Sequence, residues 1–365
     1  MPPIHHNCRC VTVPVLKGMR DDPSQTQINY KDWFNGLDRK TKLDILGPSR
    51  FKEYLAGKAV TAFAKDGQIR TLKELGVDRI TRKELLESVS VELNLTGNEF
   101  SFDNITPESL DEMAKGSAFD YKTSWRTFER MTIDGVVNEL KDKYGITFVN
   151  ARNMDVGIAR QFAYNLAKLN ERLPGFVSKT GNLYFNPVID AVEQGLNSTF
   201  AYFKTGDNSI HIVGNMRDLQ NINTLENFYQ GISNKKWWPT GGNGMTPVIH
   251  EWGHLWHTLV DKAGIDNNNI SKAIGFALPT KTGGGITEMV WNQVRTYFNN
   301  SLKPYGFEWD INFVKASLSE YANETNHEFL SEAFAEYMTS TNPRAFANIV
   351  GNIITRIWRD YGHLF

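Results

Sequence analysis

The chain has 365 residues, of which 40 are Lys or Arg and 41 are Asp or Glu, so its formal net charge is −1. This near-neutral balance argues against a dedicated nucleic-acid binder, which normally has a marked basic excess. Hydrophobic residues make up 41% and aromatic residues 12%, which excludes disorder as the general state. Two cysteines exclude a disulfide framework, and no apolar stretch approaches the ~18 residues of a membrane-spanning helix.

The N-terminal part, residues 1–96, is predicted to form a small helical segment. Within it, residues 31–90 show apolar side chains at helical spacing, with a break at Gly47-Pro48. The stretch 97–117 is rich in Asn, Ser and Asp. We therefore expect it to be a linker between two parts of the chain.

From residue 118 onward the pattern mixes helices with short strands, and after a Gly-rich loop at 237–244 it indicates helices alone. The predicted helices of the mixed part lie at 125–144, 156–173 and 219–231, and the predicted strands lie near 146–150, 183–185, 199–203 and 209–213. We expect 118–365 to form one α+β domain, mostly helical with a small twisted β-sheet.

The segment after the Gly-rich loop contains His250-Glu251-Trp-Gly-His254, an H-E-x-x-H motif. Residues four apart lie on the same face of a helix, so both imidazoles can bind one Zn²⁺. Glu251 is then placed to take a proton from the attacking water. The alternative is a chance match, which we expect in roughly one per hundred chains of this composition. The apolar neighbours of the motif favour the metal site. They indicate a buried helix, and burying two histidines and a glutamate costs free energy unless a partner such as a metal ion binds them.

Two histidines leave one protein ligand to be found. A metzincin would have a third histidine six residues after His254, but that position is Val260. His257 lies three residues after His254 and could reach the neighbourhood, although a surface or supporting role is the favoured interpretation.

Three glutamates farther along the chain, Glu328, Glu332 and Glu336, are spaced by four residues. They share one face of a predicted helix, where a row of like charges is unfavourable unless a cation lies nearby. Taken alone, the row indicates a solvated acidic stripe. Taken with the upstream motif, it predicts that a glutamate on a second helix completes the metal site.

This C-terminal region resembles the catalytic domain of the anthrax lethal factor family of zinc metallopeptidases, which are gluzincins. The resemblance rests on the H-E-x-x-H motif, on Tyr321 and on the run Glu328-Phe-Leu-Ser-Glu332-Ala-Phe, and it covers about residues 240–340. It implies a zincin-like fold, with Glu328 as the third zinc ligand and Glu332 as a carboxylate that supports a ligand histidine. It also implies that the Tyr321 hydroxyl stabilises the developing oxyanion.

The edge strand of a zincin sheet usually borders the cleft and can pair with an extended substrate. Ala201 and Tyr202, in the predicted strand at 199–203, would then line the cleft. Packing in the core explains these two residues equally well.

The N-terminal residues resemble a second family. Residues 3–10, Pro-Ile-His-His-Asn-Cys-Arg-Cys, are similar to the H-P-N-C-R-C run that ends the phage Mu F-like minor head protein domain, with His6 in place of the proline. Residues 30–57 are similar to that domain's C-terminal tail, whereas its bulk is absent, as in a fragment or split gene product. Cys8 and Cys10 could bind a metal with a neighbouring histidine, and an unpaired reduced pair is an equal alternative.

These features predict a zinc-dependent endopeptidase that acts on a polypeptide, with Glu251 as general base, encoded by a phage or prophage as a toxin or effector. The first alternative is a phage head-associated structural or interaction protein with a catalytically silent zincin fold. A hydrolase acting on other bonds is the second, because zinc chemistry does not itself select amides.

The retained Glu251 favours an active enzyme. With no secretory signal visible, we expect a cytoplasmic or virion-associated protein. Phage head proteins are candidate partners, and neither nucleic acid nor membrane is expected.

Overall fold

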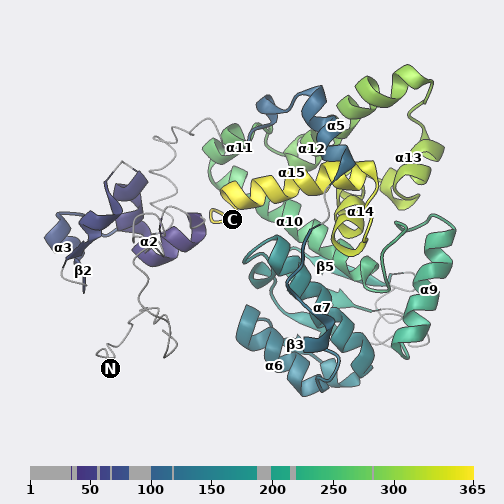
Figure 1. Cartoon of the computed structure of the whole chain (residues 1–365), viewed down its shortest axis with the longest axis horizontal. Helices are drawn as coiled ribbons and strands as arrows, with labels where there is room; N and C mark the ends of the chain where they lie inside the picture. The colour runs from purple at the N-terminus through teal and green to yellow at the C-terminus, as the bar shows by residue number, and fades with distance from the viewer. Residues whose placement is uncertain are drawn as a thin grey trace, which may run out of the picture. The chain divides into compact units, whose positions relative to one another are not determined.

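The computed structural model (Figure 1) describes residues 34, 39–55, 58–65, 68–81, 100–116, 119–186, 199–213, 219–281 and 283–365. The chain divides into two compact units, Met1–Arg79 and Ile80–Phe365.

The smaller unit contains α2 (Arg39–Leu55), a helix that kinks where the sequence predicts a break. Gly47 has φ 70°, a backbone conformation that favours glycine, and Pro48 has no N–H with which to continue the helix. The other described elements are η1 (Val60–Phe63), β1 (Ala64–Lys65), β2 (Gln68–Ile69) and α3 (Leu72–Leu75). The buried apolar side chains of this unit include Phe34, Leu43, Leu46, Phe51, Val60 and Phe63.

The prediction of a linker at 97–117 is wrong for the residues that the structure describes. η2 (Phe102–Asn104) and α5 (Pro107–Lys115) belong to the core of the larger unit, and α5 packs against α15 (Ala345–Tyr361). Four side chains from this stretch are buried in that core: Phe100, Phe102, Leu110 and Met113. Their apolar spacing outweighs the polar composition, because burying them stabilises the fold by roughly 1.5–3 kcal/mol each.

The larger unit has one small mixed sheet with the strand order β3-β4-β6-β5. Neighbouring strands are parallel except β5 and β6, which pair antiparallel as a hairpin. The strands are β3 (Phe148–Val149), β4 (Leu183–Phe185), β5 (Ala201–Lys204) and β6 (Ser209–Ile212). β5 is therefore an edge strand, and it contacts α10 (Thr246–Asp266).

Helices make up most of the larger unit, which confirms the predicted α+β class with a small sheet. Those flanking the strands in sequence are α6 (Ile133–Tyr144), α7 (Val156–Arg172) and α9 (Ile222–Asn234), with η3 (Trp125–Thr127), η4 (Ala151–Asn153) and η5 (Val177–Lys179). After α10 come α11 (Asn268–Ile274), α12 (Gly285–Tyr297), η6 (Phe298–Leu302), η7 (Lys303–Tyr305), α13 (Ile311–Ser317), η8 (Tyr321–Asn323), α14 (Asn326–Thr339) and α15. In the described part of the chain, none of these helices is both long and apolar enough to cross a bilayer.

The core of this unit centres on α10 and α14. Trp252 and Trp256 of α10 and Phe334 of α14 are fully buried. Because α10 is apolar on most sides, it lies inside the unit rather than on its surface. α14 packs against both α10 and α15, so the two helices that carry the predicted site are held from several directions.

Candidate metal centre

The first two candidate ligands come from one face of α10. Pro247 lies in the first turn of this helix, where its missing N–H costs nothing. Beside it, the buried Thr246 hydroxyl lies 2.9 Å from the hydroxyl of Thr339 at the end of α14. This contact attaches the start of α10 to the partner helix one turn before His250, and His254 follows one turn later.

The third candidate ligand comes from the first turn of α14. Thr325 caps this helix by accepting a hydrogen bond from the Glu328 N–H at 3.1 Å. Farther along, Gly253 of α10 faces Ser331, and a Cβ atom at Gly253 would lie only 2.7 Å from the Ser331 Cα. The missing side chain at position 253 therefore allows the two helices to approach closely enough for their polar groups to meet.

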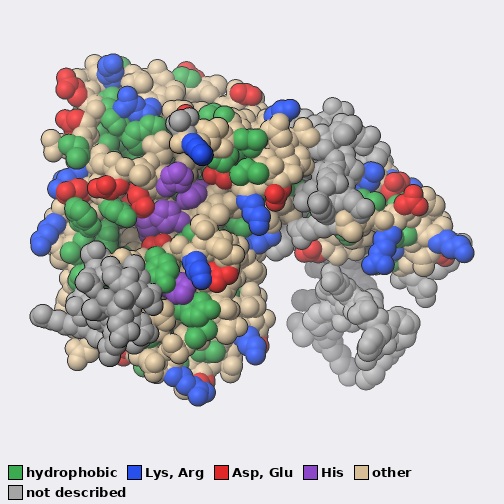
Figure 2. Space-filling view, turned by 180° about the vertical axis from the view of Figure 1, so that it is seen from behind, with side chains coloured by type: hydrophobic (Ala, Val, Ile, Leu, Met, Phe, Trp, Pro, Cys, Tyr) green, Lys and Arg blue, Asp and Glu red, His purple; other side chains and the backbone are tan. Residues whose placement is uncertain are grey.

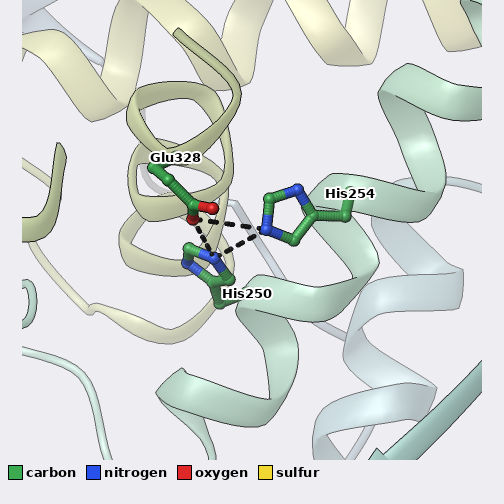
Figure 3. A group of neighbouring side chains, drawn as sticks. All are labelled: His250, His254 and Glu328. Atoms are coloured by element: carbon green, nitrogen blue, oxygen red, sulfur yellow. Dashed lines mark hydrogen bonds and ion pairs between the residues drawn. The ribbon is translucent and has the colours of Figure 1, made fainter. Parts of the chain in front are cut away.

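The side chains of His250, His254 and Glu328 converge on one point (Figure 3). The Nε2 atoms of the two histidines are 3.0 Å apart, and the Glu328 Oε2 lies 2.9 Å from the first and 3.3 Å from the second. Atoms bound at ~2.0–2.1 Å to one tetrahedral ion are separated by about 3.3 Å. The group could therefore hold a metal ion after small adjustments.

The electrostatics of the group also favour a cation. Burial opposes a charge on His250, but the adjacent carboxylates of Glu328 and Glu332 outweigh it and raise the pKa of His250 to about 10. Burial raises the pKa of Glu328, whereas the two histidines lower it more strongly, so the net shift is downward and the carboxylate is ionised. Two carboxylates around one buried imidazole thus create a position where positive charge is stabilised.

Glu332 lies behind His250, on the side away from Glu328. Its Oε1 is 2.7 Å from the His250 Nδ1, although the two groups are not aligned as a hydrogen bond, and its Oε2 has no partner among the described residues. Its side chain is 2% exposed. A carboxylate in this place orients a ligand imidazole and makes its other nitrogen a better donor to a metal.

Glu336, the third glutamate of the predicted row, does not reach this group. Its fully buried carboxylate pairs with Arg344, accepting hydrogen bonds from the backbone N–H at 2.7 Å and from the guanidinium at 2.6–3.2 Å. The four-residue spacing therefore combines a candidate ligand, a supporting carboxylate and a structural ion pair, which the sequence pattern alone could not separate.

His254 is supported by two neighbours, His257, for which the sequence favoured a surface or supporting role, and Ser331, which sequence reasoning did not single out. Its Nδ1 lies 3.1 Å from the Nε2 of His257 and 3.2 Å from the hydroxyl of Ser331. His257 is buried, outside the converging group, and its ring packs against His327. Burial, then the neighbouring histidines, lower the pKa of His257 well below its usual value, so its imidazole is neutral and its Nε2 can accept a hydrogen bond from the Nδ1–H of His254.

Glu251 lies beside the converging group without belonging to it. Its side chain is buried, and burial raises the pKa of its carboxyl although the two histidines and a hydrogen bond from the Phe203 backbone oppose the rise. A carboxylate whose pKa is raised accepts a proton more readily than a carboxylate with the ordinary pKa of an exposed side chain. The contact with Phe203 also places Glu251 next to the edge strand β5.

Tyr321 lies on η8, with its ring centre 5.8 Å from that of His250 and 6.3 Å from that of Trp237. Backbone hydrogen bonds from Glu320 to Lys236 and from Tyr321 to Trp237 attach this turn to the Gly-rich loop segment. Burial, together with the nearby carboxylates of Glu328 and Glu251, raises the pKa of Tyr321 to about 12. Its hydroxyl therefore keeps its proton and can act as a hydrogen-bond donor.

These groups open into a cleft of about 570 Å³, within the range of small-molecule and peptide sites. Figure 2 shows histidine side chains gathered in a hollow, with acidic and hydrophobic side chains around it. Ala201 and Tyr202 line the cleft, as one of the two sequence interpretations suggested, and Phe200, Trp237 and Trp238 add aromatic walls. Sequence reasoning missed these aromatic walls. The two adjacent tryptophans in the Gly-rich loop could have indicated them.

The cysteine and histidine cluster of the N-terminus, His5, His6, Cys8 and Cys10, lies outside the described residues. Comparisons of the chain with protein-family models, with curated proteins and with solved structures gave no match. The function of the metal centre therefore has to be inferred from its own side chains.

Proposed function

We propose that this chain is a zinc-dependent endopeptidase of the gluzincin type, with a zincin-like fold in its larger unit. The observation that carries the proposal is the approach of two imidazole nitrogens and one carboxylate oxygen to within 2.9–3.3 Å of one another. Two imidazoles and a carboxylate suit Zn²⁺. Three protein ligands are typical of catalytic zinc sites, which keep an open position, whereas structural sites usually have four.

When bound, zinc supplies the Lewis acidity that makes water a nucleophile near neutral pH. Glu251 is the general base, because its buried carboxyl lines the same cleft as the two histidines and has a raised pKa. The proton it accepts from the attacking water is then given to the leaving amine. The Tyr321 phenol, which stays protonated, donates a hydrogen bond to the carbonyl oxygen as negative charge develops there.

A polypeptide is the proposed substrate because of the strand that borders the cleft. β5 is an edge strand that pairs only with β6 among the described strands, and it lines the cleft through Ala201, Tyr202 and Phe203. An extended peptide can pair with the free edge of such a strand, and this would lay its backbone along the metal centre. A role as a phage- or prophage-encoded effector stays a prediction from the N-terminal sequence.

The substitution Glu251→Gln tests this proposal. It removes the base but keeps the shape of the side chain, so we expect unchanged zinc content and at least a ~100-fold loss of cleavage. Zinc is measured by metal analysis, and cleavage is measured with casein and a fluorogenic peptide library. The matched control is Glu139→Gln on α6, far in sequence from the motif, which should behave as the wild type.

Full activity of the Glu251→Gln variant would show that Glu251 is not the base. A wild-type protein that holds zinc but cleaves no peptide in either assay would contradict the peptidase proposal. It would then favour a silent zincin fold or a hydrolase acting on other bonds.

A further inference from the structure

A second cavity lies in the larger unit and shares no lining residue with the metal cleft. Its volume is about 280 Å³, and it lies between the end of α5, the end of α7, the loop after α14 and the start of α15. The described residues around it carry ammonium, guanidinium, hydroxyl and amide groups, and none of them is acidic. The charged groups of this lining are therefore all positive, and its hydroxyl and amide groups can donate hydrogen bonds to an anion.

Arg172, at the end of α7, is, with Asn348, one of the two buried polar residues of this lining. Its side chain is held against Tyr337, because Nη1 donates a 2.6 Å hydrogen bond to the Tyr337 carbonyl and the guanidinium lies 3.9 Å from the centre of the Tyr337 ring. The residue is only 7% exposed, and its Nε has no hydrogen-bond partner in the described part of the chain. Packing on Tyr337 explains the position of Arg172 but leaves this donor unused.

Lys168 lies one turn before Arg172 on the same face of α7. Its ammonium lies over the rings of Tyr121 and Tyr164, and it forms no ion pair within the described part of the chain. Its Nζ is 4.3 Å from the ring centre of Tyr121, and the guanidinium of Arg172 is 5.5 Å from that same ring. Burial, and then the charge of Arg172, lower the pKa of Lys168. Like charges one turn apart destabilise a helix, so this pair carries a cost that an anion between them would remove.

The nearest carboxylate in sequence is already bound elsewhere. Glu171 accepts hydrogen bonds from the backbone and hydroxyl of Thr123 at 2.9 and 2.6 Å, so it is not a full counter-ion for Lys168. The segment after α14 adds the hydroxyl groups of Ser340 and Thr341 to the lining of the same cavity. An oxyanion with several oxygens can accept from the cations and from these hydroxyls together.

We propose that this cavity is a binding site for the phosphate group of a small molecule, held by Lys168 and Arg172. Phosphate fits better than a carboxylate, because it has more oxygens to share between the two cations and the hydroxyls that line the same cavity. Phe119, which is 38% exposed, and Tyr121 form an aromatic wall with ring centres 4.7 Å apart. This wall gives an apolar surface for the part of the ligand attached to the phosphate.

The test is a calorimetric titration of the zinc-loaded full chain with inorganic phosphate at low salt. We expect binding in the millimolar range or tighter, reduced by about tenfold or more in Lys168→Met, which keeps the aliphatic stem and removes the charge. Arg172→Lys, which keeps the charge but not the planar fork, should also weaken binding. The matched control is Lys143→Met on α6, where the lysine pairs with Glu139 at the surface.

Two further titrations make the proposal specific. Phenyl phosphate should bind more tightly than inorganic phosphate if the Phe119 and Tyr121 wall contacts the ligand, and acetate should bind more weakly than either. Absence of phosphate binding up to ~10 mM would overturn the proposal. So would equal binding by the Lys168→Met variant, since phosphate held at the histidine cluster would be unaffected by that change. Acetate binding as tight as phosphate would overturn the choice of phosphate.

Discussion

At the scale of single residues, the candidate metal centre depends on which atoms of its three side chains face the common point and which bind other neighbours. His250 and His254 each use Nε2 toward the common point, and each has a partner at Nδ1: Glu332 in the first case and His257 in the second. The two partners differ in charge, since a carboxylate makes its imidazole a stronger donor than a neutral imidazole does. We therefore expect the two ligand histidines to contribute unequally to metal affinity.

Replacing Glu328 tests the ligand set. Glu328→Ala removes the only carboxylate oxygen of the converging group, so we expect zinc affinity to fall by more than the ~10–100-fold typical of a supporting residue. The loss of zinc affinity in Glu332→Gln should lie within that ~10–100-fold range, and Glu324→Ala should leave zinc affinity unchanged. Competition with a chromophoric chelator measures all three. Unchanged affinity in Glu328→Ala, or a larger loss in Glu332→Gln, would contradict the assignment of Glu328 as ligand.

At the scale of elements, one close helix contact sets the geometry of the site. α10 and α14 pack where Gly253 meets Ser331, and the same two helices carry every member of the converging group. A displacement of either helix by a few tenths of an ångström is comparable with the spread of the 2.9–3.3 Å separations. Packing and metal binding are therefore coupled through a single interface.

The substitution Gly253→Ala tests this coupling. Its Cβ would lie 2.7 Å from the Ser331 Cα, so we expect a loss of about 1–3 kcal/mol in unfolding free energy, together with weaker zinc binding. Gly231→Ala on α9 is the matched control, because nothing lies within 4 Å of its Cβ position. There the better helix propensity of Ala should stabilise the protein by up to ~1 kcal/mol. Denaturant unfolding and zinc titration measure both effects, and equal behaviour of the two variants would contradict the coupling.

The sequence predicted local features better than contacts between distant segments. The motif on α10 and the kink at Gly47 follow from spacing or backbone chemistry over a few residues. The spacing of Glu328, Glu332 and Glu336 did not separate them. The family resemblance singled out Glu328 as ligand and Glu332 as support, whereas the pairing of Glu336 with Arg344 is visible only in the packed structure. The failed linker prediction has a similar origin, because the partner of α5 is the C-terminal helix α15, more than two hundred residues away.

At the scale of the whole molecule, the centre joins parts of the larger unit that are distant along the chain. α11, α12 and α13 lie in sequence between the ligands of α10 and the ligand of α14. Because a metal would bind only when both helices are in place, its binding free energy adds to the folding free energy of this unit.

Removal of metal should therefore lower the thermal stability of the protein. Excess zinc at ~1,000 times its dissociation constant adds about 4 kcal/mol to the unfolding free energy, and a chelator such as EDTA should abolish this gain. Differential scanning calorimetry of the wild type and of His254→Ala, with and without zinc, measures this gain as a shift in melting temperature. The variant should lose most of the zinc-dependent shift. A full shift in His254→Ala would locate the bound metal elsewhere, for instance at Cys8 and Cys10.

The order of the elements has a consequence for the cell that makes this protein. A ribosome synthesises both histidines and the proposed base more than seventy residues before it reaches Glu328. A nascent chain that carries α10 without α14 therefore has two of the three converging groups and lacks the carboxylate. A product that stops before Glu328 would have no complete metal-binding group, so we expect it to bind the ion weakly.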